Sequence, residues 1–367
     1  VIQGVLKREM GFKGLVFTDA LNMKGVTGAG AGGNTALRAF LAGNDMLLMP
    51  ENLEADRVAL LEAYRSGLIS EARLAQSVTK ILKAKYLAGL HEQRPVSLKG
   101  LRKDLNHPQD SLLYERVMES AITVLRNPVG ILPVRRLDNK RIAYIPMGKA
   151  NHQPFLDRLR MYAEVDTVPF TNAAEARDKL RDYNLLIVGW HGSNDSPWSK
   201  DALTDADLRV LEAAAGLRTS NLVLAVFGRP YILESVPSFE GVDGLVLGYQ
   251  NSPIGQETAA ELLFGVFPAK GKLPVRAHPD FPEGFGMETP AIQRLGYSFP
   301  ERVGLDRERL AEVDTLVRHG LDSLMFPGVQ VLIARHGQVV YHKAFGYHTD
   351  RRETPVSLTD LYDLASL

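Results

Sequence analysis

Asp19 is the residue with the clearest potential for chemistry, because a single carboxylate follows the apolar run at residues 15–17. Such a run predicts a buried β-strand, and a turn and a helical pattern come after it. In barrels of alternating parallel strands and helices, catalytic groups stand at the carboxyl ends of the strands. An Asp in this place is also a common turn residue or helix N-cap. Asp19 is therefore a candidate catalytic carboxylate, with a purely structural role as the alternative.

Ser366, near the last residue of the sequence, is a second candidate nucleophile. A serine hydroxyl attacks only when an adjacent base takes its proton. Taken alone, a serine near a terminus has no particular function, so the interpretation of Ser366 depends on the segment that leads to it.

A glycine pattern and a strand-terminal loop are weaker candidates. Gly28, Gly30 and Gly33 match the spacing of a dinucleotide-binding fingerprint, but they come about ten residues after the predicted strand rather than directly behind it. We interpret them as a loop at the mouth of a barrel. The run at residues 190–195 ends a predicted strand, and we favour a turn in which Asn194 and Asp195 bond to the backbone over a loop that reaches a ligand.

Composition sets limits on the possible functions. The 367 residues include 43 Lys plus Arg and 43 Asp plus Glu, so no net charge favours nucleic acid or an anionic membrane. Cysteine is absent, and the 9 His residues show no spacing typical of a metal helix. No apolar run approaches the length of a membrane span. We expect no metal, no cofactor, no nucleic-acid partner and no membrane span.

The elements that would position Asp19 read as strands alternating with helices. We expect a helix at residues 1–10, a helix at 35–42, a second buried strand at 45–50 and helices through 51–90, one of them capped by Ser70. Apolar strands separated by helices indicate a parallel sheet covered on both faces. The polar stretch at 91–108, which contains three breakers, is the best domain boundary.

A second alternating pattern follows this boundary. A helix is expected at 111–123, and the further pattern indicates a doubly wound α/β layer. The expected strands are 142–146, 165–169, 185–189, 222–227 and 244–247, and the expected helices are about 152–161, 172–182, 202–216 and 252–264. After a stretch rich in Pro and Gly at 281–300, the pattern predicts a helix at 306–324 and a hairpin of strands 328–334 and 339–347.

Residues 11–23 resemble the nucleophile segment of glycoside hydrolase family 3, in its β-N-acetylglucosaminidase branch. The resemblance implies that Asp19 is the nucleophile of a retaining glycosidase and that Met23 lies at the substrate. It also implies the last strands and helices of a (β/α)8 barrel at 1–95 and the family's C-terminal α/β sandwich domain at 96–300. Residues 271–275 are similar to the usual end of that domain.

The end of the chain is similar to the start of a class C β-lactamase-like serine hydrolase. The hairpin and the run at 362–367 carry this resemblance, which implies a truncated α+β domain at 301–367. It makes Ser366 the nucleophile of a Ser-x-x-Lys motif, whose Lys would fall two residues beyond Leu367. We therefore expect the chain to be an internal fragment of a larger protein.

The combined resemblance implies an exported bacterial enzyme that removes terminal β-linked N-acetylhexosamine, with β-N-acetylglucosaminides or cell-wall fragments as substrates. No signal peptide is visible in the sequence. The fragment alone is expected to be inactive, because its acid catalyst would lie upstream. Two alternatives stay open, namely a non-catalytic binding or scaffold module and a serine esterase or peptidase with a vestigial glycosidase part.

Overall fold

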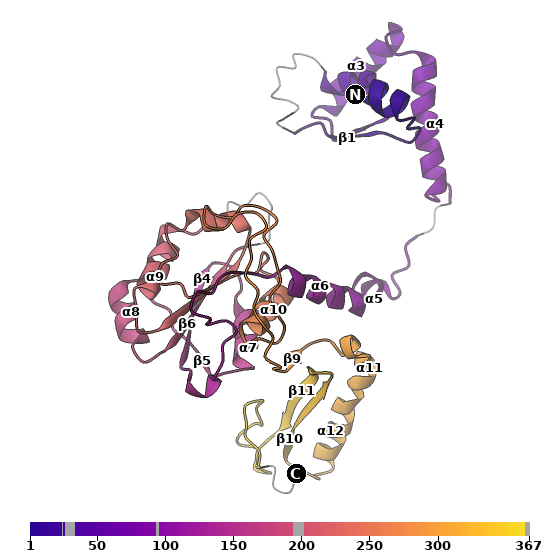
Figure 1. Ribbon diagram of the computed structural model, residues 1–367. Helices are drawn as coiled ribbons and strands as arrows, with labels where there is room; N and C mark the ends of the chain where they lie inside the picture. The colour runs from indigo at the N-terminus through magenta and orange to yellow at the C-terminus, as the bar shows by residue number, and fades with distance from the viewer. Residues whose placement is uncertain (24, 26–33, 93–94, 194–201, 364–367) are drawn as a thin grey trace. The chain divides into compact units, whose positions relative to one another are not determined.

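The structure of the protein, a computed structural model, describes residues 1–23, 25, 34–92, 95–193 and 202–363. It divides into two compact units, Val1–Leu101 and Arg102–Leu367 (Figure 1).

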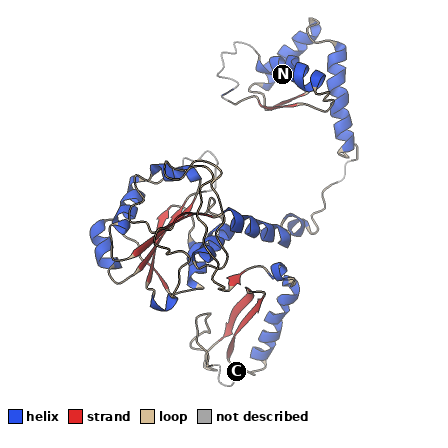
Figure 2. Ribbon diagram, viewed as in Figure 1, coloured by secondary structure: helices blue, strands red, loops and turns tan. Residues whose placement is uncertain are grey.

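The first unit is a pair of parallel strands packed with helices (Figure 2). Its elements are the π-type helix η1 (Ile2–Glu9), β1 (Phe17–Ala20), α2 (Thr35–Ala42), β2 (Met46–Leu48), α3 (Leu53–Arg65) and α4 (Glu71–Leu87). Three of these helices begin at a polar residue that accepts a backbone N–H of the first turn, which satisfies one of the free donors there. The three caps are Asn34, Asn52 and the expected Ser70.

The first strand differs from its prediction in position and in burial. The apolar run suggests residues 15–17, whereas β1 covers Phe17–Ala20, because pairing with β2 continues until Ala20 lies beside Leu48. Asp19 is therefore inside the strand, one residue before its end. The prediction that both strands are buried is wrong for the described residues, since β1 and β2 contain only exposed and half-buried positions.

The second unit contains a six-stranded sheet in the order β3-β8-β7-β6-β4-β5. Five strands are parallel, and β3 runs antiparallel to β8 at the edge. The strands are β3 (Thr123–Arg126), β4 (Ile142–Gly148), β5 (Val165–Thr167), β6 (Leu185–His191), β7 (Asn221–Phe227) and β8 (Gly244–Leu247). The helices of this part are α5 (Leu101–Leu105), α6 (Pro108–Ala121), η2 (Leu137–Asn139), α7 (Gln153–Arg160), α8 (Ala173–Leu180), α9 (Asp205–Ala215), η3 (Pro230–Ser235) and α10 (Pro253–Leu263).

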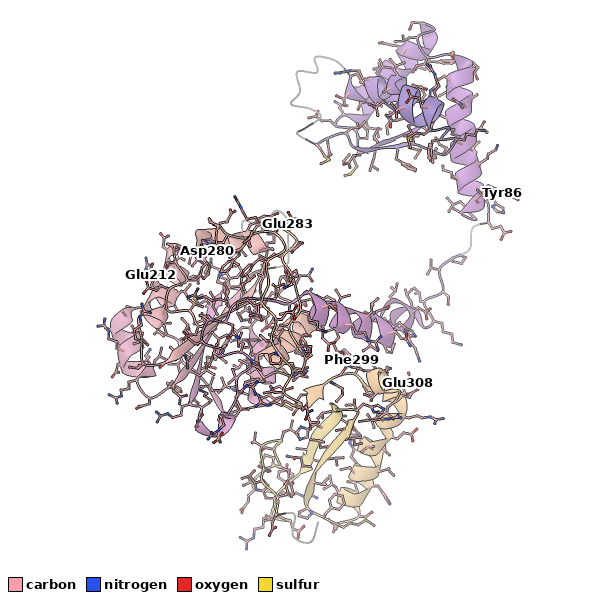
Figure 3. The ribbon with its side chains drawn as sticks, in the orientation of Figure 1. Tyr86, Glu212, Asp280, Glu283, Phe299 and Glu308 are labelled. Carbon is pink, nitrogen blue, oxygen red and sulfur yellow. The ribbon has the colours of Figure 1, made fainter. Side chains whose placement is uncertain are left out.

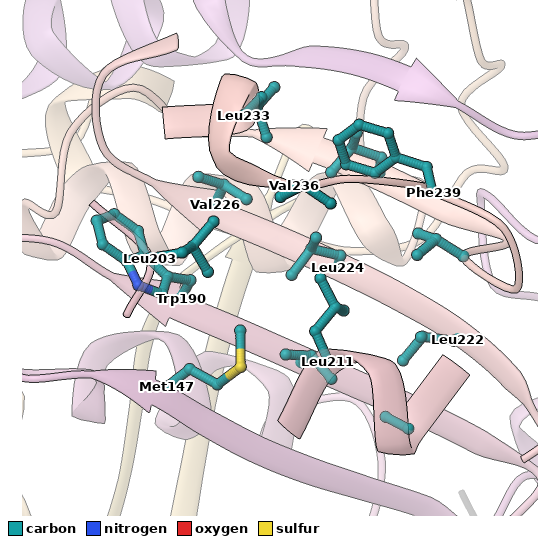
Figure 4. Close-up of a cluster of buried hydrophobic side chains, with 14 of the residues drawn as sticks. Met147, Trp190, Leu203, Leu211, Leu222, Leu224, Val226, Leu233, Val236 and Phe239 are labelled. Atoms are coloured by element: carbon teal, nitrogen blue, oxygen red, sulfur yellow. The ribbon is translucent and has the colours of Figure 1, made fainter. Parts of the chain in front are cut away.

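Helices cover both faces of this sheet, as expected for a doubly wound α/β layer. One buried apolar cluster joins α8, α9 and η3 to the sheet and includes Leu211, Leu224 and Phe239 (Figure 4). A second cluster joins α6, α7 and α10 to the other face. The strand β3 is not among the expected strands, and its first residue, Thr123, falls in the helix expected at 111–123.

The C-terminal part of the second unit is a hairpin with a helix. Its elements are β9 (Gly296–Tyr297), η4 (Pro300–Val303), α11 (Arg307–Leu310), α12 (Glu312–Asp322), β10 (Gly328–Arg335) and β11 (Gln338–Gly346). The turn at His336 and Gly337 has φ of 51° and 76°, the two positive values of a type I′ hairpin turn. The expected hairpin is confirmed, whereas the expected helix 306–324 is divided into α11 and α12.

Candidate functional site

Asp19 lies at the carboxyl end of β1, with its side chain exposed to solvent. Its Oδ1 accepts the N–H of Ala20 at 2.7 Å, which orients the carboxylate. The neighbouring backbone is fixed to β2, because Thr18 Oγ1 accepts the Leu48 N–H at 2.8 Å and the Leu21 N–H donates to the Leu48 carbonyl at 2.9 Å. The sequence therefore places an accessible, oriented carboxylate on a hydrogen-bonded strand end.

Met23 returns to the same strand end through a turn. Its N–H donates to the carbonyl of Ala20 at 3.3 Å, and the residue is 45% exposed to solvent. The structure thus brings Asp19 and Met23 to one end of β1. Gly28, Gly30 and Gly33 lie outside the described residues.

Asp45 forms a charged cluster at the opposite, amino-terminal end of the two strands. Its side chain is fully buried and accepts the hydroxyl of Ser77 at 2.6 Å, the ammonium of Lys80 at 3.2 Å and the N–H of Val16 at 3.1 Å. Arg73 also lies 3.4 Å from it, which adds a second cation from α4.

The electrostatics of this cluster favour an ionised Asp45. Burial alone would raise the pKa of Asp45, but the hydrogen bonds from Ser77, Val16 and Lys80 and the charge of Lys7, 3.8 Å away, lower it overall. Sequence analysis missed this cluster because residue 45 reads only as the first residue of an apolar strand. At the amino-terminal end of parallel strands such a group contributes to stability rather than to catalysis.

The six-stranded sheet and the helices on its two faces are called the sandwich from here on. His191 ends β6, at the carboxyl edge of this sheet, and is fully buried. Its Nδ1 lies 2.7 Å from the carbonyl oxygen Oδ1 of Asn251, which can only accept, so Nδ1 carries the proton. Its Nε2 then accepts the hydroxyl of Tyr144 at 2.9 Å. Burial lowers the pKa of His191 to about 4, so the imidazole is neutral and fully engaged. His191 is thus a structural residue, and Asn194 and Asp195 behind it lie outside the described residues.

Two serines near the C-terminal end of the chain, Ser357 and Ser366, are considered as nucleophiles. Ser366 lies outside the described residues. Ser357 is near a histidine, but its hydroxyl donates to Asp360 at 2.8 Å, while His348 Nε2 contacts the same carboxylate at 2.6 Å. Because no hydrogen bond joins Ser357 to His348, this serine lacks the base that a nucleophile needs.

Within 1–23, 25, 34–92, 95–193 and 202–363, no group of three or more His, Asp or Glu side chains is arranged to hold a metal ion. Over the same ranges, no helix combines the length and apolar character that crossing a bilayer requires.

Comparison with known proteins points to one family. Residues 1–84 match the glycosyl hydrolase family 3 N terminal domain. The chain is 28% identical over 295 residues to the β-N-acetylglucosaminidase/β-glucosidase of Cellulomonas fimi, which covers 76% of this chain and 52% of that protein. It is 27% identical over 156 residues to β-hexosaminidase A of Pseudoalteromonas piscicida, or 40% of this chain and 25% of that protein.

A solved structure shows the same fold. It is the glycoside hydrolase family 3 β-N-acetylglucosaminidase from Paenibacillus sp. str. FPU-7, with a TM-score of 0.55, 23% identity, and coverage of 76% of this chain and 53% of that one. The chain is therefore similar to family 3 proteins, with the N-terminal domain match in its first 84 residues. It spans about half the length of the Cellulomonas relative and a quarter of the Pseudoalteromonas one.

Proposed function

We propose that this chain is the part of a retaining family 3 glycoside hydrolase that supplies the nucleophile, Asp19. The observation that carries the proposal is the position of Asp19, an exposed and oriented carboxylate at the carboxyl end of β1, within the segment that matches the family 3 N-terminal domain. A nucleophile in a barrel stands at this end of its strand.

Asp19 would attack the anomeric carbon and expel the leaving oxygen, forming a covalent glycosyl-enzyme. Water would then open this ester with net retention of configuration. A second group must protonate the leaving oxygen, and His191 is unsuited to that task because both its ring nitrogens are engaged in the sandwich core. We propose a proton donor outside residues 1–367, in agreement with our expectation that this chain alone is inactive.

The proposed substrate is a terminal β-linked N-acetylhexosamine, which includes β-N-acetylglucosaminides and fragments of cell wall. Two relatives support it, since their names include β-N-acetylglucosaminidase and β-hexosaminidase activity. The first name also includes β-glucosidase, so an aryl β-glucoside belongs in every assay. An exported bacterial location goes with this substrate as part of the proposal.

The test is Asp19→Asn in the longest natural protein that carries this sequence. The amide keeps the size of the carboxylate but is a poor nucleophile, so we expect kcat for an aryl β-N-acetylglucosaminide to fall by at least about a thousandfold with little change in substrate affinity. Asp56→Asn, on α3, is the matched control and should keep its rate. A 2-fluoro sugar should label Asp19, and a mutant rate within tenfold of wild type would remove Asp19 from this role.

We also propose that residues 301–367 open a β-lactamase-like serine hydrolase domain with Ser366 as nucleophile. The type I′ hairpin of β10 and β11 beside α12 is compatible with such a start. A fluorophosphonate probe should label Ser366 in a protein extended past Leu367, and Ser366→Ala should abolish the label. Labelling at another residue refutes this second proposal and leaves the role of Asp19 unaffected.

A further inference from the structure

A cavity of about 230 Å³ lies in the second unit, between the sandwich and the C-terminal hairpin. Its sandwich wall comes from α10, α7 and α6, and its other wall comes from β11 and the segment around Phe299, which Figure 3 labels. The proposed glycosidase chemistry uses none of these residues, so the cavity requires its own explanation.

One group of charged side chains at the cavity is centred on Arg158. Its guanidinium contacts Glu257 at 2.9 Å and makes a closer contact with Glu261. Glu261 also accepts the N–H of Tyr297 at 3.0 Å. Two carboxylates on one face of α10 thus share a single cation.

A second group of charges is centred on Arg302, and here too one arginine contacts two carboxylates. Arg302 contacts Glu115 at 2.8 Å and Glu119 at 2.5 Å, and Ser298 donates a further hydrogen bond to Glu115 at 2.8 Å. Three of these carboxylates, Glu115, Glu257 and Glu261, line the cavity together with a single guanidinium group, that of Arg158, while Arg302 and Glu119 pair behind Glu115.

Other charges near the cavity do not remove this excess of negative charge. Lys343, on β11, is neutralised by Asp314 at 2.8 Å, and Arg307 by Glu301 at 2.7 Å. Asp157 adds further negative potential at Glu257.

Partial or full burial shifts the pKa values of the three carboxylates that line the cavity, since Glu115 and Glu261 are buried and Glu257 is half-buried. Burial raises the pKa of Glu115 and of Glu257, and it raises the pKa of Glu261 to about 7, against the opposing effect of the arginines. A cation in the cavity would favour the ionised form of all three.

His342 lines the same cavity from β11. Both of its ring nitrogens are shielded from solvent, and neither has a hydrogen-bond partner in the structure. Burial lowers the pKa of His342, so its ring is neutral and offers one N–H donor and one acceptor. Leaving both unsatisfied is costly, which a ligand with its own donor and acceptor would relieve.

Aromatic rings complete the wall and are compatible with a cation. Tyr297, Phe299 and Tyr341 line the cavity, and each already has a Lys or Arg group within 5.2 Å of its ring centroid. Aromatic faces together with carboxylates are typical of sites that recognise ammonium groups. A metal ion is a poorer match, because the described residues contain no group arranged to hold one.

We propose that this cavity binds a small primary amine that carries hydroxyl groups, such as an amino sugar or an amino alcohol. The ammonium donates to Glu257, one hydroxyl group donates to the unprotonated ring nitrogen of His342, and a second hydroxyl group accepts from its protonated ring nitrogen. The site is independent of Asp19 and lies on the second unit alone.

The first test is calorimetric titration of the 367-residue chain with D-glucosamine and with D-glucose at neutral pH. The two sugars differ only at C2, where glucosamine carries an amine that can be protonated and glucose carries a hydroxyl group. We expect saturable binding of glucosamine and at least about tenfold weaker binding of glucose, the effect of losing a charged hydrogen bond. Equal binding of the two sugars, or no saturable binding of glucosamine, would refute the proposal.

Variants then locate the site. Glu257→Gln should weaken glucosamine binding about tenfold, and His342→Leu should weaken it several-fold. Glu283→Gln, at an exposed residue outside the cavity, is the matched control and should leave binding unchanged. Circular dichroism identifies variants that fail to fold. Unchanged affinity in a folded Glu257→Gln or His342→Leu variant would exclude this cavity as the site.

Discussion

In the sandwich, β6 is buried along its whole length, whereas every residue of β1 and β2 in the first unit is exposed or half-buried. The two regions therefore stabilise parallel strands by different means. Helices cover both faces of the sandwich sheet, and two large apolar clusters result. The first unit has one small cluster around Phe40, Ala63 and Ile69, together with the charged cluster at Asp45.

This difference indicates where each unit is vulnerable. Apolar burial contributes roughly in proportion to the area removed from water, so the sandwich depends on many residues that each contribute a similar amount. A buried carboxylate with cationic partners contributes through a few contacts, and the loss of one member leaves the others uncompensated. The unit that carries Asp19 thus depends on electrostatics more than the sandwich does.

The largest effect should come from Leu224→Ala in the sandwich. Leu224 is fully buried on β7, so the substitution should lower the free energy of unfolding by about 4 kcal/mol through lost burial and a cavity. Both tryptophans, Trp190 and Trp198, belong to the second unit, so their fluorescence during denaturation reports it selectively. The exposed Leu316→Ala is the control, and a similar loss there would show that burial is not the cause.

A somewhat smaller effect is expected from Asp45→Asn in the first unit. The amide keeps the bond with Ser77 but leaves Lys7, Arg73 and Lys80 without their counter-charge, which should cost about 3 kcal/mol. Hydrogen exchange of α4 should accelerate while tryptophan fluorescence of the second unit stays unchanged. The exposed Glu62→Gln is the control. If α4 in the Asp45→Asn variant keeps its normal protection against hydrogen exchange, the charged cluster at Asp45 does not stabilise the first unit.

The smallest effect, measured per unit of pH, is an opposite pH dependence of the free energy of unfolding of the two units. The folded pKa of Asp45 lies below its unfolded value, so its contribution is complete above about pH 4 and is lost as the pH falls further. The folded pKa of Glu261 is raised to about 7, so its ionisation destabilises the second unit as the pH rises from about 4.5 to 7. Each group can change stability by at most about 1.4 kcal/mol per pH unit.

Denaturation at a series of pH values, followed by hydrogen exchange for the first unit and by fluorescence for the second, measures both trends. Glu261→Gln should flatten the trend of the second unit only. Parallel trends in the two units would show that these two carboxylates do not dominate the pH dependence.

The sequence by itself predicted the elements whose signal is local. The strand expected at 222–227 is β7 (Asn221–Phe227), and the helix expected at 252–264 is α10 (Pro253–Leu263). The Ser70 cap of α4 and the hairpin of strands 328–334 and 339–347 were also predicted correctly. Apolar periodicity, capping residues and turn residues act over a few positions, so a pattern along the chain contains them.

Other features were decided only by the tertiary structure. The strand β3 exists because Thr123–Arg126 pairs with β8, more than a hundred residues away, and a run of four residues directly behind the helix expected at 111–123 is too short to indicate a strand by itself. The end of β1 was set by its hydrogen bonds to β2, which carried the strand past the polar Thr18 and Asp19.

The charged sites show the same division between local pattern and tertiary contact. Asp19 could be singled out because a carboxylate behind an apolar run is visible along the chain. Asp45 and the cavity at Glu257 and His342 could not, because their partners come from distant elements that meet only in the folded protein. Burial and shared counter-charges shift the pKa values of such groups. Both depend on contacts between distant elements in the folded protein, and the order of residues alone does not reveal them.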